Sequence, residues 1–167
     1  AASNVIRLVR TRGLCVLRQL RLEESLFRAN AENWAIVNDG APRTAIVLGI
    51  SGKPHRLIDV AAAHRDDLLV IKRFSGGGTV VVDANTQLVS LVMNAEAVAP
   101  TPLFPHPLMR WTESLYKGMD TRDENAGVFR DVPNWRLHQN DYVVEVSDVP
   151  SVDERVAKKI LKVGGNA

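Results

Sequence analysis

Residues 68–83 read LLVIKRFSGGGTVVVD and place a glycine-rich loop between two short apolar runs. Both runs have the aliphatic and β-branched composition of buried strands. Three successive glycines remove every Cβ, so backbone N–H groups of the loop can approach an anion or a flat ligand closely. A lysine and Arg73 add positive charge beside the loop. A flexible hairpin turn is the plain alternative, but the entropy cost of three glycines and the adjacent cations favour a binding loop at the mouth of a sheet.

The segments on either side alternate between helix and strand patterns. Apolar residues recur at helical spacing in three segments, and we expect helices at about 20–27, 55–64 and 108–116. Short apolar runs predict further strands at 4–10, 13–17, 34–37, 44–48 and 88–93, and at the end of 135–146. The turn composition of 38–42 and 83–86 predicts hairpins at both places. These patterns predict an α+β domain with a mixed or antiparallel sheet flanked by helices.

The composition is that of an ordinary globular domain. The 167 residues include 46% hydrophobic and 24% charged residues. We therefore expect one domain over residues 1–167, with a hydrophobic core that is stable without disulfides or metals. Cys15 is the single cysteine and cannot form an internal disulfide. No apolar run is long enough to span a membrane. The 21 basic and 19 acidic residues nearly cancel without a long block of like charge, so we expect no nucleic-acid partner.

Several common site motifs are absent from the sequence. It contains neither G-x-x-x-x-G-K-[ST] nor G-x-G-x-x-G between a strand and a helix, which argues against a P-loop and a Rossmann dinucleotide site. The serine in Gly-Ile-Ser-Gly at 49–52 lacks the spacing of a hydrolase nucleophile elbow. The histidines have no zinc-ligand spacing, and we expect all of them on the surface or in loops. They are His55, His64, His106 and His138.

The glycine loop and other segments resemble one enzyme family. Residues 73–83, RFSGGGTVVVD, resemble the R-x-S-G-G-G-x-V-x-x-D signature of lipoate-protein ligases. The resemblance covers most of the chain and is strongest to the plant and protist branch. It implies a biotin/lipoate ligase-like catalytic domain. The other similar segments follow in the family's order: LEESL at 22–26, NWAIVNDG at 33–40, IVLGISGK at 46–53, LVSL at 88–91, NDYV at 140–143 and KVGGNA at 162–167.

This resemblance implies a two-step reaction. ATP and lipoate give lipoyl-AMP and pyrophosphate, and the lipoyl group then passes to a lysine of a lipoyl-domain acceptor protein. ATP is implied as cosubstrate, Mg²⁺ as cofactor and lipoate as substrate. The implied acceptors are E2 subunits of 2-oxoacid dehydrogenases and the glycine cleavage H protein. We expect a monomer in the mitochondrion or plastid, with the cytoplasm as the alternative.

The resemblance also implies roles for individual residues. Lys162 is the expected catalytic residue, with an ammonium that bridges the acyl carboxylate and the α-phosphate. Asp141 is the expected Mg²⁺ ligand. Without the resemblance, Lys162 would be interpreted as a solvated lysine, and residues 140–141 as a turn before a strand. The residues expected to bind ATP or lipoyl-AMP are Arg73, Ser75, Gly76, Gly77, Gly78, Thr79, Val80, Val81, Asn140, Asp141 and Lys162.

The sequence also departs from the family's pattern. Val82 stands where many bacterial members carry a histidine. The family continues past its G-G-N-A segment, so we expect the C-terminal part of the domain to be missing, and residues 147–159 predict an exposed acidic insertion. Two alternatives stay open: a lipoyl or octanoyl transferase that uses a preformed acyl donor without ATP, and a non-catalytic nucleotide- or acyl-binding fragment. An octanoyltransferase needs a cysteine nucleophile, whereas we expect Cys15 to be a small core residue on an early strand.

Overall fold

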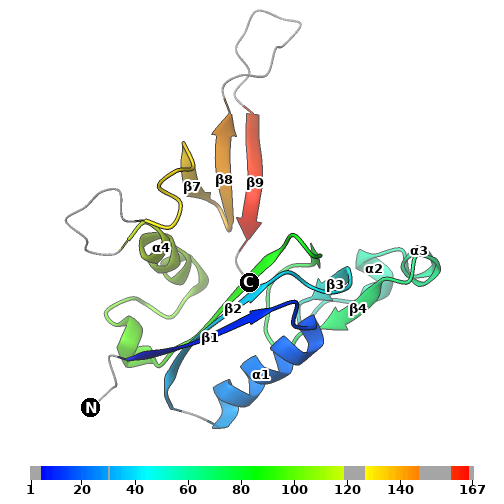
Figure 1. Cartoon of the computed structure of the whole chain (residues 1–167), viewed down its shortest axis with the longest axis horizontal. Coiled ribbons are helices and arrows are strands. Elements are labelled where there is room, and N and C mark those ends of the chain that lie inside the picture. Colours follow the sequence, from blue (N-terminus) through cyan, green and yellow to red (C-terminus); the bar gives the residue numbers. More distant parts are fainter. Residues whose placement is uncertain (1–4, 30, 119–126, 147–158, 166–167) are drawn as a thin grey trace, which may run out of the picture. The chain divides into compact units, whose positions relative to one another are not determined.

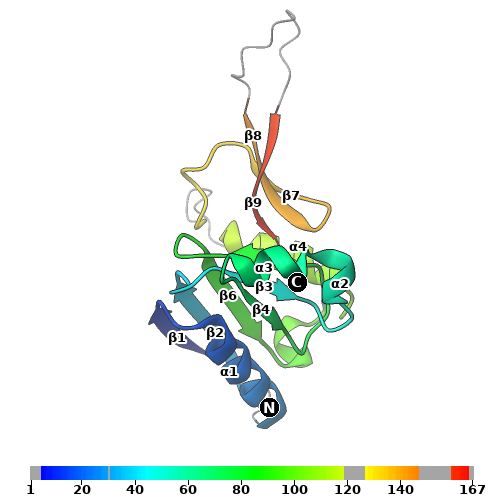
Figure 2. The same ribbon diagram turned by 90° about the vertical axis from the view of Figure 1, so that its right-hand side faces the viewer.

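The computed structural model describes residues 5–29, 31–118, 127–146 and 159–165, which form two compact units. The first unit extends to Val98, and the second begins at Ala99. Figures 1 and 2 show the elements of each unit in two views. Within the described residues, none of the helices has both the length and the apolar character that crossing a bilayer requires. The expected α+β class is confirmed.

The first sheet of the first unit combines a parallel and an antiparallel pair. Its strand order is β1-β2-β6, with β1 parallel and β6 antiparallel to β2. Helix α1 connects β1 to β2, as a parallel pair requires, and it packs against β2 and β6. The elements are β1 (Ile6–Arg12), α1 (Val16–Ala29), β2 (Asn33–Asp39) and β6 (Gln87–Val92), followed by the 3₁₀ turn η1 (Ala95–Val98).

The second sheet carries the glycine loop. Its order is β4-β3-β5, with β4 parallel and β5 antiparallel to the central strand β3. All four residues of β3 are buried, which explains why this strand is an unbroken apolar run rather than an alternating one. The elements are β3 (Ala45–Leu48), α2 (Pro54–Leu57), α3 (Val60–Arg65), β4 (Leu69–Lys72) and β5 (Val80–Val82).

Both predicted hairpins of this unit are wrong. The strands on either side of 38–42 belong to different sheets, and so do the strands on either side of 83–86. The two connections instead lie side by side: Gly40 N donates to the Thr86 carbonyl at 3.1 Å, and Ala41 N donates to the Asp83 carbonyl at 2.8 Å. Turn composition shows that the chain changes direction, but it does not identify the sheet in which the next strand pairs.

Two other expectations for this unit also need correction. The predicted strand at 13–17 does not form, because α1 already begins at Val16 and Cys15 directly precedes that helix. The single helix expected at 55–64 is two helices, α2 and α3. The extended backbone of Ile58 ends the first helix. Asp59 caps the second, because its side chain accepts a hydrogen bond from Ala62 N at 2.9 Å.

In its described residues, the second unit consists of an antiparallel sheet, one helix and an aromatic core. Its strand order is β7-β8-β9. The Trp135 ring stacks on Tyr142, with centroids 5.0 Å apart, and on Phe129, with centroids 4.6 Å apart. Tyr116 meets these rings edge to face, an arrangement that aromatic pairs prefer. The elements are α4 (Pro105–Tyr116), β7 (Trp135–His138), β8 (Asp141–Val146) and β9 (Lys159–Gly165).

The sequence pattern predicted the helix of this unit well, but it predicted the strands at the C-terminal end of the unit poorly. Helix α4 begins three residues before the expected start, since Pro105 occupies its first turn. The segment 135–146 is a hairpin of two strands rather than a single final strand. Gly164 and Gly165 lie in strand β9, which the strand patterns in the sequence did not predict. The expected acidic insertion lies largely outside the described residues. The four histidines are exposed, as predicted.

Glu113 joins α4 to β7 and should make the stability of this unit depend on pH. Its Oε1 accepts hydrogen bonds from Lys117 Nζ at 2.8 Å and from Leu137 N at 3.1 Å. Burial alone would raise the pKa of Glu113, but these bonds and the nearby cations outweigh it and lower the pKa. A lowered folded-state pKa contributes stability above the unfolded-state value, and that contribution is lost as pH falls through the folded value. We expect Glu113→Gln to lower the urea midpoint at pH 7.

The difference between the Glu113→Gln variant and the unchanged chain should shrink as the titration is repeated toward acidic pH. Glu24→Gln serves as the control, because Glu24 forms an exposed helical ion pair with Arg28, a type of pair that contributes little. A difference at pH 7 that persists unchanged below the pKa of both states would contradict the prediction.

Candidate functional site

The glycine loop packs backbone to backbone against the loop that follows β3. Ile50 N donates to the Ser75 carbonyl at 2.9 Å, and Arg73 N donates to the Leu48 carbonyl at 2.9 Å. A Cβ added at Gly49 would lie only 2.2 Å from the Gly77 carbonyl oxygen, so no other residue fits there without moving one of the loops. Gly77 itself has φ of +99°, which favours glycine. Together the two loops form a closely packed double layer at the end of the second sheet.

The buried side chain of Arg73 stabilises the glycine loop through hydrogen bonds to its carbonyl groups. It is 7% exposed, and its Nε donates to the Gly76 carbonyl at 2.9 Å while Nη2 donates to the Gly78 carbonyl at 3.0 Å. Burial lowers the pKa of the Arg73 guanidinium, and the charge of Glu23 offsets part of that effect. The resemblance predicts that Arg73 lines the nucleotide phosphates, whereas two of its donors are used to shape the loop.

Replacing Arg73 by lysine should therefore destabilise the protein although the charge is kept. A lysine cannot form the two-pronged contact of a guanidinium, and buried hydrogen bonds to charged groups are each worth about 1.5–3 kcal/mol. We expect Arg73→Lys to lower the free energy of unfolding by about that amount in urea denaturation. Lys72→Arg, at the exposed neighbouring position, should change it by less than about 0.5 kcal/mol. Equal stability of the two variants would show that the contacts with the loop carbonyls contribute nothing.

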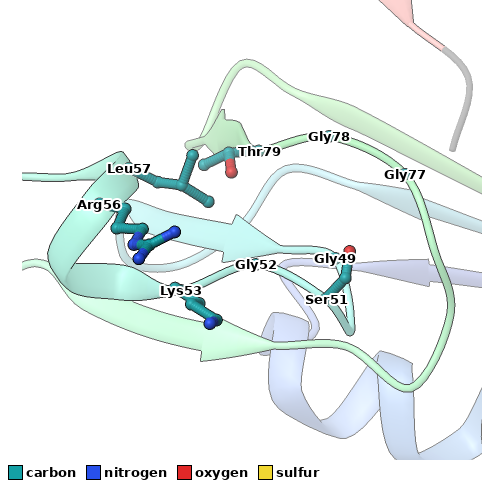
Figure 3. A pocket seen from close by; sticks show the side chains of 9 residues that line it. All are labelled: Gly49, Ser51, Gly52, Lys53, Arg56, Leu57, Gly77, Gly78 and Thr79. Carbon is teal, nitrogen blue, oxygen red and sulfur yellow. The ribbon is translucent and has the colours of Figure 1, made fainter.

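An open pocket of about 400 Å³ lies beside the glycine loop. Its wall consists of the loop after β3, the first turn of α2 and the glycine loop, as Figure 3 shows. Lys53 and Arg56 bring two exposed cations to it, and the side chains of Leu57 and Thr79 add an apolar and a hydroxyl contact. The lining residues are Gly49, Ser51, Gly52, Lys53, Arg56, Leu57, Gly77, Gly78 and Thr79.

The sequence interpretation found only one wall of this pocket. Gly77, Gly78 and Thr79 were expected to bind nucleotide, but Lys53 and Arg56 were not singled out. The available signal was the run Gly-Ile-Ser-Gly-Lys at 49–53, a second glycine- and cation-containing loop at the end of an apolar strand. Its importance depends on the close approach of the two loops, which local sequence does not reveal.

The remaining loop and strand residues of the expected nucleotide site have different surroundings. Gly76 and Gly78 face open space, since a Cβ added at either would meet no atom within 4 Å. Val80 and Val81 belong to β5 and are both exposed, Val81 to 64%. Ser75 uses its carbonyl to accept the hydrogen bond from Ile50. The glycine loop therefore offers backbone and small apolar surface.

The other expected residues lie together in the second unit. Lys162 Nζ and Asp141 Oδ1 are 2.8 Å apart, and the two side chains are 57% and 39% exposed. Asp141 is the first residue of β8, Lys162 lies on the neighbouring strand β9, and Asn140 precedes β8 in the hairpin turn. The structure thus brings Lys162, Asp141 and Asn140 to one end of a strand pair.

The donor set around Asp141 does not build a magnesium site by itself. Its Oδ1 is already paired with the ammonium of Lys162, and a cation at this distance disfavours a second cation on the same oxygen. In the part of the chain that the structure describes, no three His, Cys, Asp or Glu side chains cluster as metal ligands would. The expected role of Asp141 as a Mg²⁺ ligand therefore finds no support in its contacts.

Comparison with known proteins agrees with the resemblance. The model of the lipoyl protein ligase A/B catalytic domain matches residues 16–167. A protein of Plasmodium falciparum named inactive lipoate–protein ligase 2 is 27% identical in an alignment 202 positions long, which covers 98% of this chain and 51% of that protein. The chain thus spans about half the length of this curated relative.

Solved structures share the fold at low sequence identity. The bipartite lipoate protein ligase of Thermoplasma acidophilum superimposes with a TM-score of 0.64 at 15% identity, over 83% of this chain and 50% of that one. A lipoate-protein ligase A bound with ATP gives a TM-score of 0.56 at 13% identity, over 84% of this chain and 60% of that one. Since the family model covers nearly the whole sequence, this chain belongs to the lipoyl protein ligase A/B catalytic-domain family.

Proposed function

We propose that this chain catalyses ATP-dependent activation of lipoate to lipoyl-AMP and transfer of the lipoyl group to a lysine of a lipoyl-domain protein. The observation that carries the proposal is the pocket beside the glycine loop, with Lys53 and Arg56 on its wall. It combines fixed backbone, cations and apolar surface, which a ligand with phosphates and an aliphatic tail requires. Membership of the lipoyl protein ligase family and the fold shared with an ATP-bound ligase support this choice of ligand.

The chemistry of the first step explains why cations are needed. A lipoate carboxylate oxygen attacks the α-phosphorus of ATP, and the bond from that phosphorus to the bridging oxygen breaks to release pyrophosphate. Two anionic groups must meet, so preorganised N–H donors and ammonium or guanidinium groups lower the barrier. We assign phosphate contacts to Lys53 and Arg56 of the pocket. For Lys162, the family resemblance implies the contact with the reacting carboxylate and α-phosphate.

The second step needs no nucleophilic side chain from this chain. The amine of the acceptor lysine attacks the acyl carbonyl of lipoyl-AMP, AMP leaves, and the amine proton passes to solvent or to the departing phosphate. Lys162 would again stabilise negative charge as it develops on the phosphate. We propose a lipoyl domain as acceptor, in line with the archaeal relative, whose structural study includes its E2 lipoyl domain.

Pyrophosphate release tests this function directly. The chain, with its fold checked by circular dichroism, is incubated with ATP, lipoate and an isolated lipoyl domain. We expect pyrophosphate release that requires lipoate, followed by a mass increase of one lipoyl group on the acceptor. If the chain lipoylates the acceptor only from preformed lipoyl-AMP, it is a transferase that does not use ATP, and the ligase proposal fails.

The two cations of the pocket provide a variant for the same function. Replacing both Lys53 and Arg56 by alanine should weaken lipoyl-AMP binding about tenfold or more, because charge-assisted hydrogen bonds are each worth about 1.5–3 kcal/mol. Calorimetric titration measures the change. Arg65→Ala removes a cation that pairs with Asp66 on α3 and should leave the dissociation constant unchanged. Equal affinity of the double variant and the unchanged chain would remove both residues from the site.

A second candidate is a non-catalytic protein that binds lipoyl-AMP or a related ligand. The name of the Plasmodium relative, inactive lipoate–protein ligase 2, favours this alternative. Calorimetry with a non-hydrolysable lipoyl-adenylate analogue discriminates between the two. Tight binding without pyrophosphate release or acyl transfer would establish the non-catalytic role.

A further inference from the structure

The pairing of β8 with β9 contains an irregularity next to Lys162. The register is regular from Val146 opposite Lys159 up to Val143 opposite Lys162, but Tyr142 then faces Gly164. Val163 is therefore passed over, as in a β-bulge, which bends a strand and re-aims the side chains beside it. The shift by one residue places Gly165, instead of Gly164, opposite Asp141.

The ion pair of Lys162 and Asp141 lies directly beside Gly165. A Cβ added at Gly165 would be 3.0 Å from Asp141 Oδ1 and 3.4 Å from Lys162 Nζ. Both atoms are ends of flexible side chains, so a methyl group would push the ion pair aside by a few tenths of an ångström without disturbing the backbone. The neighbouring Gly164 faces Tyr142 instead, and a Cβ there would make only ordinary contact, 3.4 Å from the ring.

We propose that Gly165 is a positioning residue for Lys162. The absence of a side chain at Gly165 leaves the space in which the Asp141 carboxylate holds the Lys162 ammonium at one end of the strand pair. In this arrangement Asp141 acts as the counter-ion of Lys162 and not as a metal ligand. The catalytic part of this inference rests on the proposed function of Lys162, whereas the positioning part is a property of the strand pair and can be tested without turnover.

The first experiment measures the accessibility of the Lys162 amine. The folded chain is treated briefly with an amine-acylating reagent, and labelling of Lys162 relative to Lys159 is quantified by mass spectrometry. An ammonium held against a carboxylate must leave it before its nitrogen can react. We expect Gly165→Ala and Asp141→Asn to raise Lys162 labelling about two- to fivefold, the factor that an exposed ion pair supplies. Gly164→Ala is the matched control and should leave labelling unchanged.

The second experiment separates positioning from binding. In the pyrophosphate assay, Gly165→Ala should lower kcat about threefold or more, because a misplacement of about 1 Å can cost about a hundredfold and a shift of a few tenths of an ångström costs correspondingly less. The KM values for ATP and lipoate should stay within about twofold, since the binding groups are unchanged. Gly164→Ala should retain normal kcat, and a similar loss of kcat in both glycine variants would overturn the proposal.

Metal binding provides the third readout. Mn²⁺ added without nucleotide should not broaden the NMR signals of Asp141 and Gly165 selectively. Selective broadening that Asp141→Asn abolishes would overturn the counter-ion role. Unchanged Lys162 labelling in Gly165→Ala would likewise overturn the positioning role. If the chain releases no pyrophosphate but both variants raise the labelling, the proposed function fails and the positioning inference stands.

Discussion

Replacing Lys162 by alanine should reduce lipoate-dependent pyrophosphate release at least about 100-fold. The loss of one preorganised group that stabilises charge in the transition state typically costs 10²–10³ in rate. We assign to this ammonium the stabilisation of the negative charge that develops between the carboxylate and the α-phosphate. The effect should fall on kcat more than on the KM for lipoate, because the charge develops fully only as the new bond forms. Single-turnover measurements with ATP and lipoate provide the comparison.

Lys159 offers a matched control for this experiment. It is an exposed lysine at the first position of the same strand, opposite Val146. Lys159→Ala should keep the rate within about twofold, since it changes net charge by the same amount without touching the ion pair of Lys162 with Asp141. Near-normal pyrophosphate release by Lys162→Ala would show that Lys162 is not a catalytic residue.

Replacing Gly49 by alanine should damage both stability and ligand binding. The new methyl group would overlap the Gly77 carbonyl oxygen, which lies 2.2 Å from the ideal Cβ position. One of the two loops must move, and overpacking of this kind costs about 1–3 kcal/mol. Because Gly77 also lines the pocket, we expect a lower melting temperature together with weaker binding of lipoyl-AMP in calorimetry.

Gly78→Ala isolates the steric effect from a general effect of losing a glycine. A Cβ at Gly78 meets no atom within 4 Å, so its melting temperature should match or exceed that of the unchanged chain, since alanine restricts the unfolded state more than glycine does. A Gly49→Ala variant as stable as Gly78→Ala would mean that the contact between the two loops is dispensable.

Local patterns were sufficient to find most elements of the fold. The helical spacing around Leu22 and Leu26 and the unbroken apolar run 45–48 both correspond to real elements, α1 and β3. Such patterns record which side chains must be buried, and burial depends on the residues of the segment itself. The strand partners were predicted poorly, because β6 pairs with β2 and β5 pairs with β3, strands that are not their neighbours in the sequence.

The candidate site shows the same division. The glycine loop was evident because its unusual composition is local, and Lys162 was found through the resemblance of the K-V-G-G-N-A segment. Lys53 and Arg56 were missed, since their importance depends on the glycine loop lying opposite them in the pocket. The ion pair of Lys162 with Asp141 was missed because it depends on the register of β8 and β9, which no short motif specifies.

The buried position of Arg73 has a consequence for the polarity of the glycine loop. Its guanidinium draws the carbonyl oxygens of Gly76 and Gly78 toward itself. In a trans peptide the N–H points opposite to the C=O of the same unit, so the amides of Gly77 and Thr79 are turned away from the guanidinium. A cation inside the loop thereby orients donor groups outward, and the loop can attract an anion that never touches the arginine.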